Sequence, residues 1–333
     1  MQVGVLGTGR MGAFRAGALA AHRDVERVVV GSHDPERARR VAEPLGAGWA
    51  SVPDVLRADL DAIVVSTVTG EHPAQIAEAV GRGLPVLCEK PISVDLVDTE
   101  RVVELVADAG VAVQIAFQRR FDPAFRRARE MLSGGELGTV YSLRIAAHDH
   151  EPSDERYIPT SGGIFRDLHV HDFDMARWLT RLEATEVYAT GSVRAWERFA
   201  RFDDVDTSAT VVSLEGGVPV LVSGSRHDPA GYDFRTEILG SDASIAVGVD
   251  GRTPLRSLEP GAEPPASSPY IGFLDRFQEA FRAETDAFVD LALGRGENHC
   301  PPVEALEALR IAEACDRSWR EHRPVTLTEV SRG

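Results

Sequence analysis

The stretch VGVLGTGRMG at residues 3–12 decides the fold. A short apolar run leads into glycines spaced Gly-x-Gly-x-x-Gly, and a helical pattern follows from about residue 11 to 21. The first glycine of such a motif allows a tight turn, the second lets the backbone approach a pyrophosphate, and the third lets helix and strand pack closely. Free N–H groups at the helix start attract phosphate. We therefore predict dinucleotide binding at Gly7, Gly9, Arg10, Met11 and Gly12.

Apolar runs alternate with amphipathic helical patterns over the first 120 residues. We expect strands at 3–6, 28–30, 61–66, 85–88 and 111–117, and helices at 11–21, 35–45, 73–82 and 95–109. Short all-apolar strands that alternate with helices are typical of a parallel sheet covered on both faces. Residues 1–120 are therefore predicted to form an α/β Rossmann domain that binds NAD(P).

The pattern changes after residue 121, so residues 121–333 are predicted to form a second domain. We expect helices at 123–132, 163–179, 273–293 and 303–322, and strands at 140–147, 186–193, 207–214, 218–225 and 234–239. Consecutive strands joined by glycine-rich turns indicate an antiparallel α+β arrangement. The prolines between residues 253 and 270 predict an irregular surface loop.

Composition narrows the classes of partner. Lys plus Arg number 36 and Asp plus Glu number 52, which gives a formal net charge of −16. An acidic surface repels phosphate backbones and anionic lipids, so we expect neither nucleic acid nor membrane as a partner. The sequence contains no apolar run of membrane-spanning length and no signal-peptide pattern. Its three scattered cysteines fit no disulfide or zinc framework, and we expect a cytoplasmic protein.

The residues that follow the second strand bear on the choice between NAD and NADP. An acidic residue about 20 positions after the glycine motif would hold the ribose 2′-hydroxyl of NAD. Ser32 stands there, His33 follows it, and Asp34 precedes a proline and suits a helix N-cap. Ser32 can donate to a 2′-phosphate, while Arg10 and Arg37 can supply positive charge. The sequence therefore favours NADP over NAD.

Two segments carry the residues predicted to perform the chemistry. Lys90, within Glu-Lys-Pro at 89–91, follows a parallel strand at its carboxyl end, where such sheets bind ligands. Asp167 and His171 are four residues apart, which places them on one face of a regular helix. A histidine beside carboxylates is a natural proton acceptor near neutral pH. His169 points elsewhere on this helix and is expected to be structural.

A metal site is a competing interpretation of the histidines. His148 and His150 would share one face of a strand, and His169 and His171 lie in a second segment rich in acids. Neither segment has zinc-finger or zincin spacing, so we predict no metal. Judged alone, residues 162–174 also fit a structural segment with histidines in the core and carboxylates on the helix surface.

The chain resembles the glucose–fructose oxidoreductase and inositol dehydrogenase (Gfo/Idh/MocA) family, most nearly its inositol 2-dehydrogenase branch. The resemblance rests on GTGRMG at 7–12, EKP at 89–91, QIAFQRRFDP at 114–123, GGIFRDLHVHDFDMARWL at 162–179 and GYDFR at 231–235. It implies a Rossmann domain followed by a substrate-binding α+β domain with a large open, mainly antiparallel sheet, through which homodimers or homotetramers form. It also implies an NAD(P)-dependent dehydrogenase that reversibly oxidises a secondary hydroxyl of a cyclic polyol or sugar.

The resemblance further implies roles for single residues. Lys90 would hydrogen-bond the reacting hydroxyl and relay its proton, His171 would be the general acid and base, and Asp167 would orient the histidine or a substrate hydroxyl. The other predicted substrate contacts are Arg119, Arg120, Asp174 and Tyr232. The other predicted cofactor contacts are Ser32, His33, Arg37, Thr67, Thr69, His72, Glu89, Lys90 and Gln118.

Departures from the family pattern leave alternatives open. Ser32 replaces the aspartate of NAD-using members, and Gln118 stands where the inositol branch is expected to carry methionine. Relatives that act on hexoses or keto-sugars make a hexose dehydrogenase or ketoreductase the first alternative. A non-catalytic cofactor or sugar sensor on the same fold is the alternative of another class, and the presence of Lys90 and His171 disfavours it.

Overall fold

The computed structural model describes residues 1–330, and these residues form two compact units. The first unit contains Met1–Gln118 together with Phe281–Leu306, and the second contains Arg119–Ala280 together with residues 307–330. The sequence analysis placed the boundary between residues 120 and 121. It did not predict that the chain returns to the first unit, and it had assigned residues 281–306 to the second domain.

The first unit is built on a parallel sheet in the strand order β3-β2-β1-β4-β5-β6. Val3 of β1 lies opposite both Val28 of β2 and Ala62 of β4, so the strand order reverses at β1. This is the doubly wound arrangement predicted from the sequence, in which ligands bind at the carboxyl ends of the strands beside the reversal. The strands are β1 (Gln2–Leu6), β2 (Arg27–Gly31), β3 (Gly48–Ala50), β4 (Ala62–Val65), β5 (Val86–Glu89) and β6 (Val113–Ala116).

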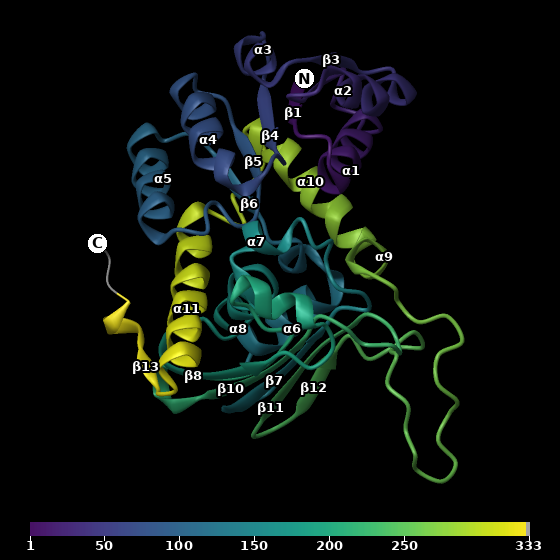
Figure 1. Ribbon diagram of the computed structural model, residues 1–333, viewed down its shortest axis with the longest axis vertical. Helices are drawn as coiled ribbons and strands as arrows, with labels where there is room; N and C mark the ends of the chain where they lie inside the picture. Colours follow the sequence, from purple (N-terminus) through teal and green to yellow (C-terminus); the bar gives the residue numbers. More distant parts are fainter. Residues whose placement is uncertain (331–333) are drawn as a thin grey trace. The chain divides into compact units, whose positions relative to one another are not determined.

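Helices cover both faces of this sheet. Figure 1 shows α4 and α5 on one side of the central strands and α1 and α10 on the other. Phe288 and Val289 of α10 belong to the same buried cluster as Leu19 of α1 and Val5 of β1, which explains why this late helix belongs to the first unit. The helices are α1 (Arg10–Ala20), α2 (Pro35–Ala42), α3 (Val52–Arg57), α4 (His72–Gly81), α5 (Leu96–Ala109) and α10 (Gln278–Ala292).

The second unit is built on a sheet in the order β12-β11-β7-β10-β9-β8-β13. All of its strand pairs are antiparallel except β7 with β10. The α+β class with a large, mainly antiparallel sheet is therefore confirmed. The strands are β7 (Val140–His148), β8 (Ala184–Ser192), β9 (Thr207–Leu214), β10 (Pro219–Ser225), β11 (Asp233–Gly240), β12 (Ser244–Val247) and β13 (Val325–Thr326).

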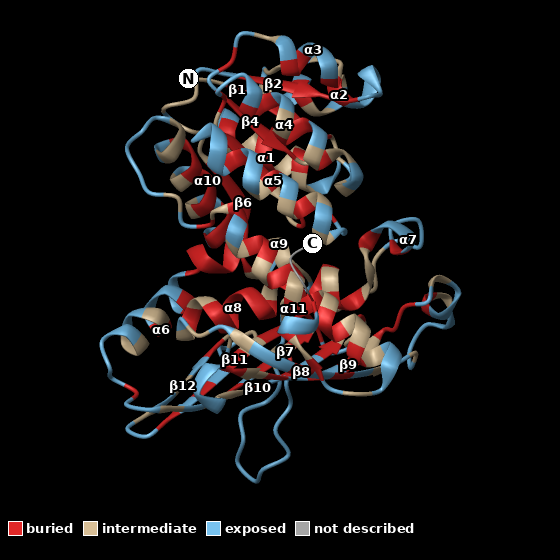
Figure 2. Cartoon of the chain, turned by 90° about the vertical axis from the view of Figure 1, so that its left-hand side faces the viewer, coloured by how far each residue is buried: buried red, intermediate tan, exposed pale blue. Residues whose placement is uncertain are grey.

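Helices cover one face of this second sheet and leave the other open. Figure 1 shows α6, α8 and α11 on the same side of the strands, and Figure 2 shows the buried residues concentrated between these layers. The predicted loop over 253–270 is irregular, as expected. The helices are α6 (Pro123–Ser133), α7 (Ile158–Ser161), α8 (Val170–Thr180), α9 (Phe273–Arg276) and α11 (Pro302–Glu321).

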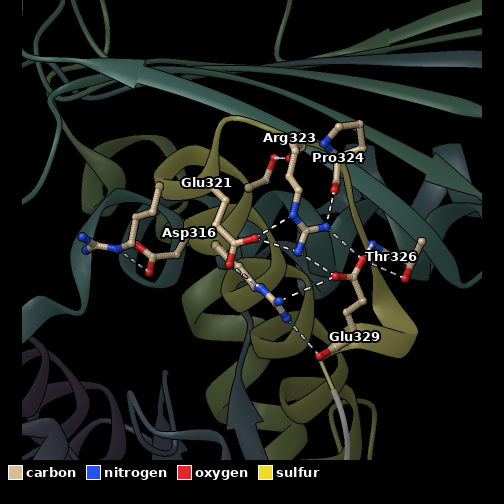
Figure 3. A network of polar contacts seen from close by, with 9 residues as sticks. Asp316, Glu321, Arg323, Pro324, Thr326 and Glu329 are labelled. Atoms are coloured by element: carbon tan, nitrogen blue, oxygen red, sulfur yellow. Dashed lines mark hydrogen bonds and ion pairs between the residues drawn. The ribbon is translucent and has the colours of Figure 1, made fainter.

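A polar network fastens the end of the described chain (Figure 3). The Arg323 guanidinium lies 2.6 Å from a Glu321 oxygen and 2.7 Å from a Glu329 oxygen, and Glu329 also accepts the backbone N–H of Thr326. These contacts hold β13 beside β8, where Val325 lies opposite Val187. None of the helices within residues 1–330 combines the length and apolar character that a membrane span requires.

Candidate active site

The glycine loop between β1 and α1 has the geometry of a phosphate cradle. Gly7 has a φ of +106°, and a Cβ there would lie 2.2 Å from the Ser66 carbonyl oxygen. A Cβ on Gly12 would lie 2.2 Å from the Gly7 carbonyl oxygen, so this glycine permits the helix to approach the loop. Nothing lies within 4 Å of a Cβ built on Gly9, which leaves open space beside the backbone. The loop therefore fits a dinucleotide pyrophosphate.

Ser32, at the end of β2, lies next to this loop. Its Oγ is 3.3 Å from the Thr8 hydroxyl and accepts the backbone N–H of Asp34 at 3.2 Å. The Asp34 carboxylate accepts the N–H groups of Glu36 and Arg37, which confirms its predicted role as the N-cap of α2. An acidic side chain is thus present near the tip of β2, but it is engaged in capping a helix.

The loop after β4 adds a carboxylate that the sequence interpretation missed. The Nε2 of His33 lies 2.9 and 3.0 Å from the two oxygens of Glu71. Gln75 donates to Glu71 at 2.9 Å and accepts the hydroxyl hydrogen of Thr67 at 2.8 Å. This chain of contacts fixes the loop that carries Thr69 beside the tip of β2. Nothing in the local pattern around residue 71 distinguishes Glu71 from a solvated helix-start acid.

His72 joins the loops after β4 and β5. The side chain is buried, with Nδ1 2.9 Å from the Pro91 carbonyl oxygen and Nε2 3.2 Å from the Thr67 carbonyl oxygen. Burial lowers the pKa of His72, although both carbonyl contacts favour its cation. The sequence placed His72 along the cofactor. That position stays a prediction, and in this structure both ring nitrogens contact carbonyl oxygens of the loops after β4 and β5.

Lys90 has a distinction that a motif search does not reveal. Of the 36 lysine and arginine residues in the chain, only residue 90 is lysine. A guanidinium stays protonated under all physiological conditions, whereas an amine can exchange a proton. The one side-chain amine of the chain thus stands at the carboxyl end of a parallel strand, where such sheets bind ligands. Counting lysines would have provided this signal.

A π-helical turn lies at the centre of the second predicted segment. It spans Phe165–His169 and leads directly into α8. The sequence predicted one regular helix, in which Asp167 and His171 share a face. A π turn contains one residue more than an α-helical turn, so it changes which side chains share a face of the helix. Such turns are frequent at functional sites.

Asp167 sits in this π turn and is held on both of its carboxylate oxygens. Tyr157 donates its hydroxyl to Oδ1 at 2.9 Å, and Arg226 donates to Oδ2 at 2.9 Å. Arg226 is buried and also lies 3.6 Å from Asp149. Burial disfavours the Arg226 cation, but Asp167, Asp149 and Asp204 together raise its pKa. Sequence analysis identified neither Tyr157 nor Arg226.

His169 is structural, as expected. Its ring is fully buried, with Nδ1 2.8 Å from Asp172 and Nε2 2.7 Å from the Ser208 hydroxyl. Asp172 also accepts a hydrogen bond from Arg119 at 2.5 Å. Burial disfavours the Asp172 carboxylate, but Arg119 and His169 outweigh this and lower its pKa. The Arg119 guanidinium also stacks 4.6 Å from the Phe234 ring.

Several predicted substrate contacts are buried in this structure. Arg120 donates to both oxygens of Asp174, at 3.0 and 2.5 Å, and neither side chain is exposed. Tyr232 stacks on Phe234 with ring centroids 4.2 Å apart, and burial raises the pKa of its hydroxyl well above the usual value. Substrate contacts therefore remain predictions for Arg119, Arg120, Asp174 and Tyr232. Burial of the Arg120–Asp174 ion pair and of the Tyr232–Phe234 stack favours structural roles for these side chains.

The histidines of the competing metal interpretation do not form one cluster. Among the described residues, the histidine-containing group with suitable spacing is His148, Asp228 and Asp233. His148 already contacts Ser223 and Asp233 is paired with Arg235, so both have protein partners. His150 lies 3.0 Å from the Asp228 carbonyl oxygen through Nδ1. The arrangement gives no support to a site built from both histidine segments.

Comparisons with known proteins agree with this geometry. Residues 1–117 match the family model described as an oxidoreductase family with an NAD-binding Rossmann fold, and residues 125–246 match the GFO/IDH/MocA C-terminal domain. A myo-inositol dehydrogenase of Streptomyces leeuwenhoekii is 36% identical over 96% of this chain and 97% of its own length.

Solved structures show the same similarity. A myo-inositol dehydrogenase of Corynebacterium glutamicum superposes with a TM-score of 0.89 at 34% identity, covering 98% of both chains. A scyllo-inositol dehydrogenase of Lactobacillus casei, solved with bound NAD(H) and scyllo-inositol, gives a TM-score of 0.89 at 26% identity, covering 98% of this chain and 99% of that one.

The fold, the glycine cradle and the matched models define a nicotinamide-dependent oxidoreductase that acts on CH–OH groups. The chain belongs to the Gfo/Idh/MocA oxidoreductase family, close to its inositol 2-dehydrogenases.

Proposed function

We propose that this enzyme reversibly oxidises a secondary ring hydroxyl of an inositol or a closely related cyclic polyol to the ketone. The observation that carries the proposal is Lys90, the single lysine of the chain, in a Glu-Lys-Pro motif at the carboxyl end of β5. The relatives named as inositol dehydrogenases, which match nearly the whole length of the chain, support the substrate class.

The proposed chemistry uses three side chains of this protein. His171 takes the hydroxyl proton as the general base and returns it in the reverse direction. Lys90 donates a hydrogen bond to the reacting oxygen and stabilises its developing negative charge. Asp167, fixed by Tyr157 and Arg226, orients His171 or an adjacent substrate hydroxyl. The nicotinamide supplies the hydride acceptor.

We propose NADP as the preferred cofactor. Ser32 replaces the acid that would bind a ribose 2′-hydroxyl, and the nearby Asp34 carboxylate is engaged in capping α2. Arg37 lies in the first turn of α2 and can approach a 2′-phosphate. The Glu71 carboxylate opposes this preference in part, because it places a negative charge against His33 near the tip of β2.

The test is reduction of cofactor, followed by absorbance at 340 nm, with myo-inositol, scyllo-inositol and common hexoses against NAD and NADP. Turnover with an inositol and NADP is the expected result. Turnover only with NAD would overturn the cofactor proposal, and turnover only with hexoses would overturn the substrate. Binding of reduced cofactor without turnover on any polyol or keto-sugar would favour a sensor.

Variants distinguish the proposed catalytic residues. Lys90→Arg keeps a positive charge but removes the exchangeable amine, and His171→Asn removes the base. We expect each to lower kcat by about 10²-fold or more, while the dissociation constant of the cofactor changes little. Unchanged turnover in either variant would show that its residue has another role.

We also propose that the open face of the second sheet joins two copies of the chain. Its exposed apolar side chains include Tyr188, Val211 and Leu221, of which each exposes at least 41% of its surface. Exposed apolar patches of this kind mark interaction surfaces. Leu221→Glu is expected to give monomers in sedimentation equilibrium, whereas Val97→Glu, on exposed α5, leaves the assembly unchanged. A monomeric wild type would overturn the proposal.

A further inference from the structure

A buried charge cluster lies within the first unit, next to the Glu-Lys-Pro loop. Arg15 of α1 is fully buried and donates from Nε to Glu89 at 2.8 Å and from Nη2 to Glu284 of α10 at 2.5 Å. Its Nη1 donates to the Thr285 hydroxyl at 3.2 Å. One guanidinium therefore joins the helix after the glycine loop, the residue before Lys90, and the late helix α10.

The charges of this cluster do not balance. Arg15 faces two carboxylates, and Glu284 is fully buried while Glu89 keeps 14% of its side chain exposed. The Glu284 oxygen Oε1 is buried and has no hydrogen-bond partner among the described residues. The neighbouring Gln114 contributes only a neutral amide, through Nε2 to the Glu284 carbonyl oxygen at 3.4 Å. A proton on Glu284 would remove the uncompensated charge.

The electrostatics agree with this geometry. Burial raises the pKa of Glu284 to about 7, with Glu89 acting in the same direction and Arg15 opposing. The charged groups that face Glu284 are thus Arg15 from α1 and Glu89 from β5. At neutral pH, protonated and ionised forms of Glu284 are both populated.

We propose that Arg15 and Glu284 are positioning residues that hold the Glu89 carboxylate, and through it the loop of Lys90, with Glu284 as the member that gains and loses a proton. This inference rests on the proposed role of Lys90 in dehydrogenation. When Glu284 is protonated, the positive charge of Arg15 is balanced by the Glu89 carboxylate alone. When Glu284 ionises, the two carboxylates share one guanidinium, so the negative charge of Glu89, next to Lys90, is less completely compensated.

The single lysine makes a direct test possible. Protein labelled with ¹³C at the lysine ε-carbon gives one lysine resonance, that of Lys90, because the chain has no other lysine. We expect its chemical shift to show a step near pH 7 in the wild type. The step should be absent in Glu284→Gln and retained in Glu279→Gln, an exposed position on the same helix.

A second variant covers the case in which Glu284→Gln fails to fold. Thr285→Val removes one hydrogen bond from Arg15 without removing a titrating group, and should displace the Lys90 resonance while keeping the step. A resonance with the same position and pH profile in the wild type and in every folded variant would overturn the proposal.

Kinetics separate this inference from the proposed activity. With an active polyol, the pH profiles of kcat for the wild type and Glu284→Gln should diverge by about tenfold between pH 6 and 8, as expected for one ionisation near 7. Coincident profiles would overturn the proposal. The resonance experiment needs no substrate, so absence of turnover would refute the proposed function and leave this inference to be decided by the resonance.

Discussion

Arg226 donates a hydrogen bond to Oδ2 of Asp167 across 59 residues of sequence, at 2.9 Å, and both side chains are largely buried. The same guanidinium compensates Asp149, and burial raises the pKa of the nearby Asp204 carboxyl. Arg226 therefore compensates the negative charges that surround Asp167 in the π turn.

Replacing Arg226 with methionine should destabilise the protein strongly. Methionine fills part of the space but leaves the Asp149, Asp167 and Asp204 carboxyls without their cation. We expect the free energy of unfolding to fall by about 3–5 kcal/mol, since breaking a buried ion pair leaves an uncompensated charge. Urea denaturation followed by circular dichroism measures the change. Arg156→Met, which removes an exposed partner of Asp154, is the control and should leave the midpoint unchanged. Equal midpoints for both variants would contradict this account.

Two alanine substitutions in the cradle should have different effects. Gly9→Ala places a Cβ in open space at a φ of −71°, so folding should be unaffected while pyrophosphate can no longer approach. We expect the dissociation constant of the reduced cofactor to rise about tenfold or more, which corresponds to ~1.4 kcal/mol. Gly12→Ala clashes with the Gly7 carbonyl oxygen and should lower the melting temperature as well. Fluorescence titration and thermal melting separate the two effects, and a Gly9→Ala variant with unchanged affinity would argue against the cradle.

Ser32→Asp should exchange the cofactor preference. A carboxylate at this position, beside Thr8, repels a 2′-phosphate and can accept a 2′-hydroxyl. The dissociation constant for NADPH should rise by about tenfold or more and that for NADH should fall, because the substitution places a negative charge where a neutral hydroxyl stood. Ser32→Ala, which changes no charge, is the control and should have the smaller effect. The NADP proposal would be wrong if Ser32→Asp left the ratio of the two affinities unchanged.

Stability should depend on pH through Glu284. Burial raises its pKa from 4.5 to about 7, so between these values the folded state binds more protons than the unfolded state. The free energy of unfolding therefore falls as pH rises through this range, by an amount on the order of 3 kcal/mol. Glu284→Gln should lose this component of the pH dependence. Urea denaturation at pH 5 and pH 8 measures the change in the free energy of unfolding. An equal decrease in the wild type and in Glu284→Gln would contradict this prediction.

Much of the first unit could be predicted because its signals are local. The strands that begin the fold are continuous apolar runs, and Asp34 before a proline marks the start of α2. The strand Gly48–Ala50 was missed because three residues carry no periodicity. The segment Gln278–Ala292 was recognised as a helix, but the periodicity of a helix does not say which sheet it covers.

The candidate site was predictable only where its residues lie in motifs. Lys90, Asp167 and His171 stand in characteristic segments, whereas Tyr157 and Arg226 contact Asp167 through tertiary structure alone. The π turn has no residue signature, because its additional residue is accommodated by packing rather than by propensity. The acidic group at Glu71 was missed because the loops that bring it to His33 are distant in sequence.

The return of residues 281–306 to the first unit limits how this protein can be divided. A recombinant fragment that stops at Gln118 would lack Phe288 and Val289 from its core. The Arg15 guanidinium would also lose its ion pair with Glu284. The first 118 residues are consequently not expected to fold as an independent domain, although they contain every strand of the parallel sheet. Exchange of this half between relatives would have to transplant α10 together with the first 118 residues, as a matched pair.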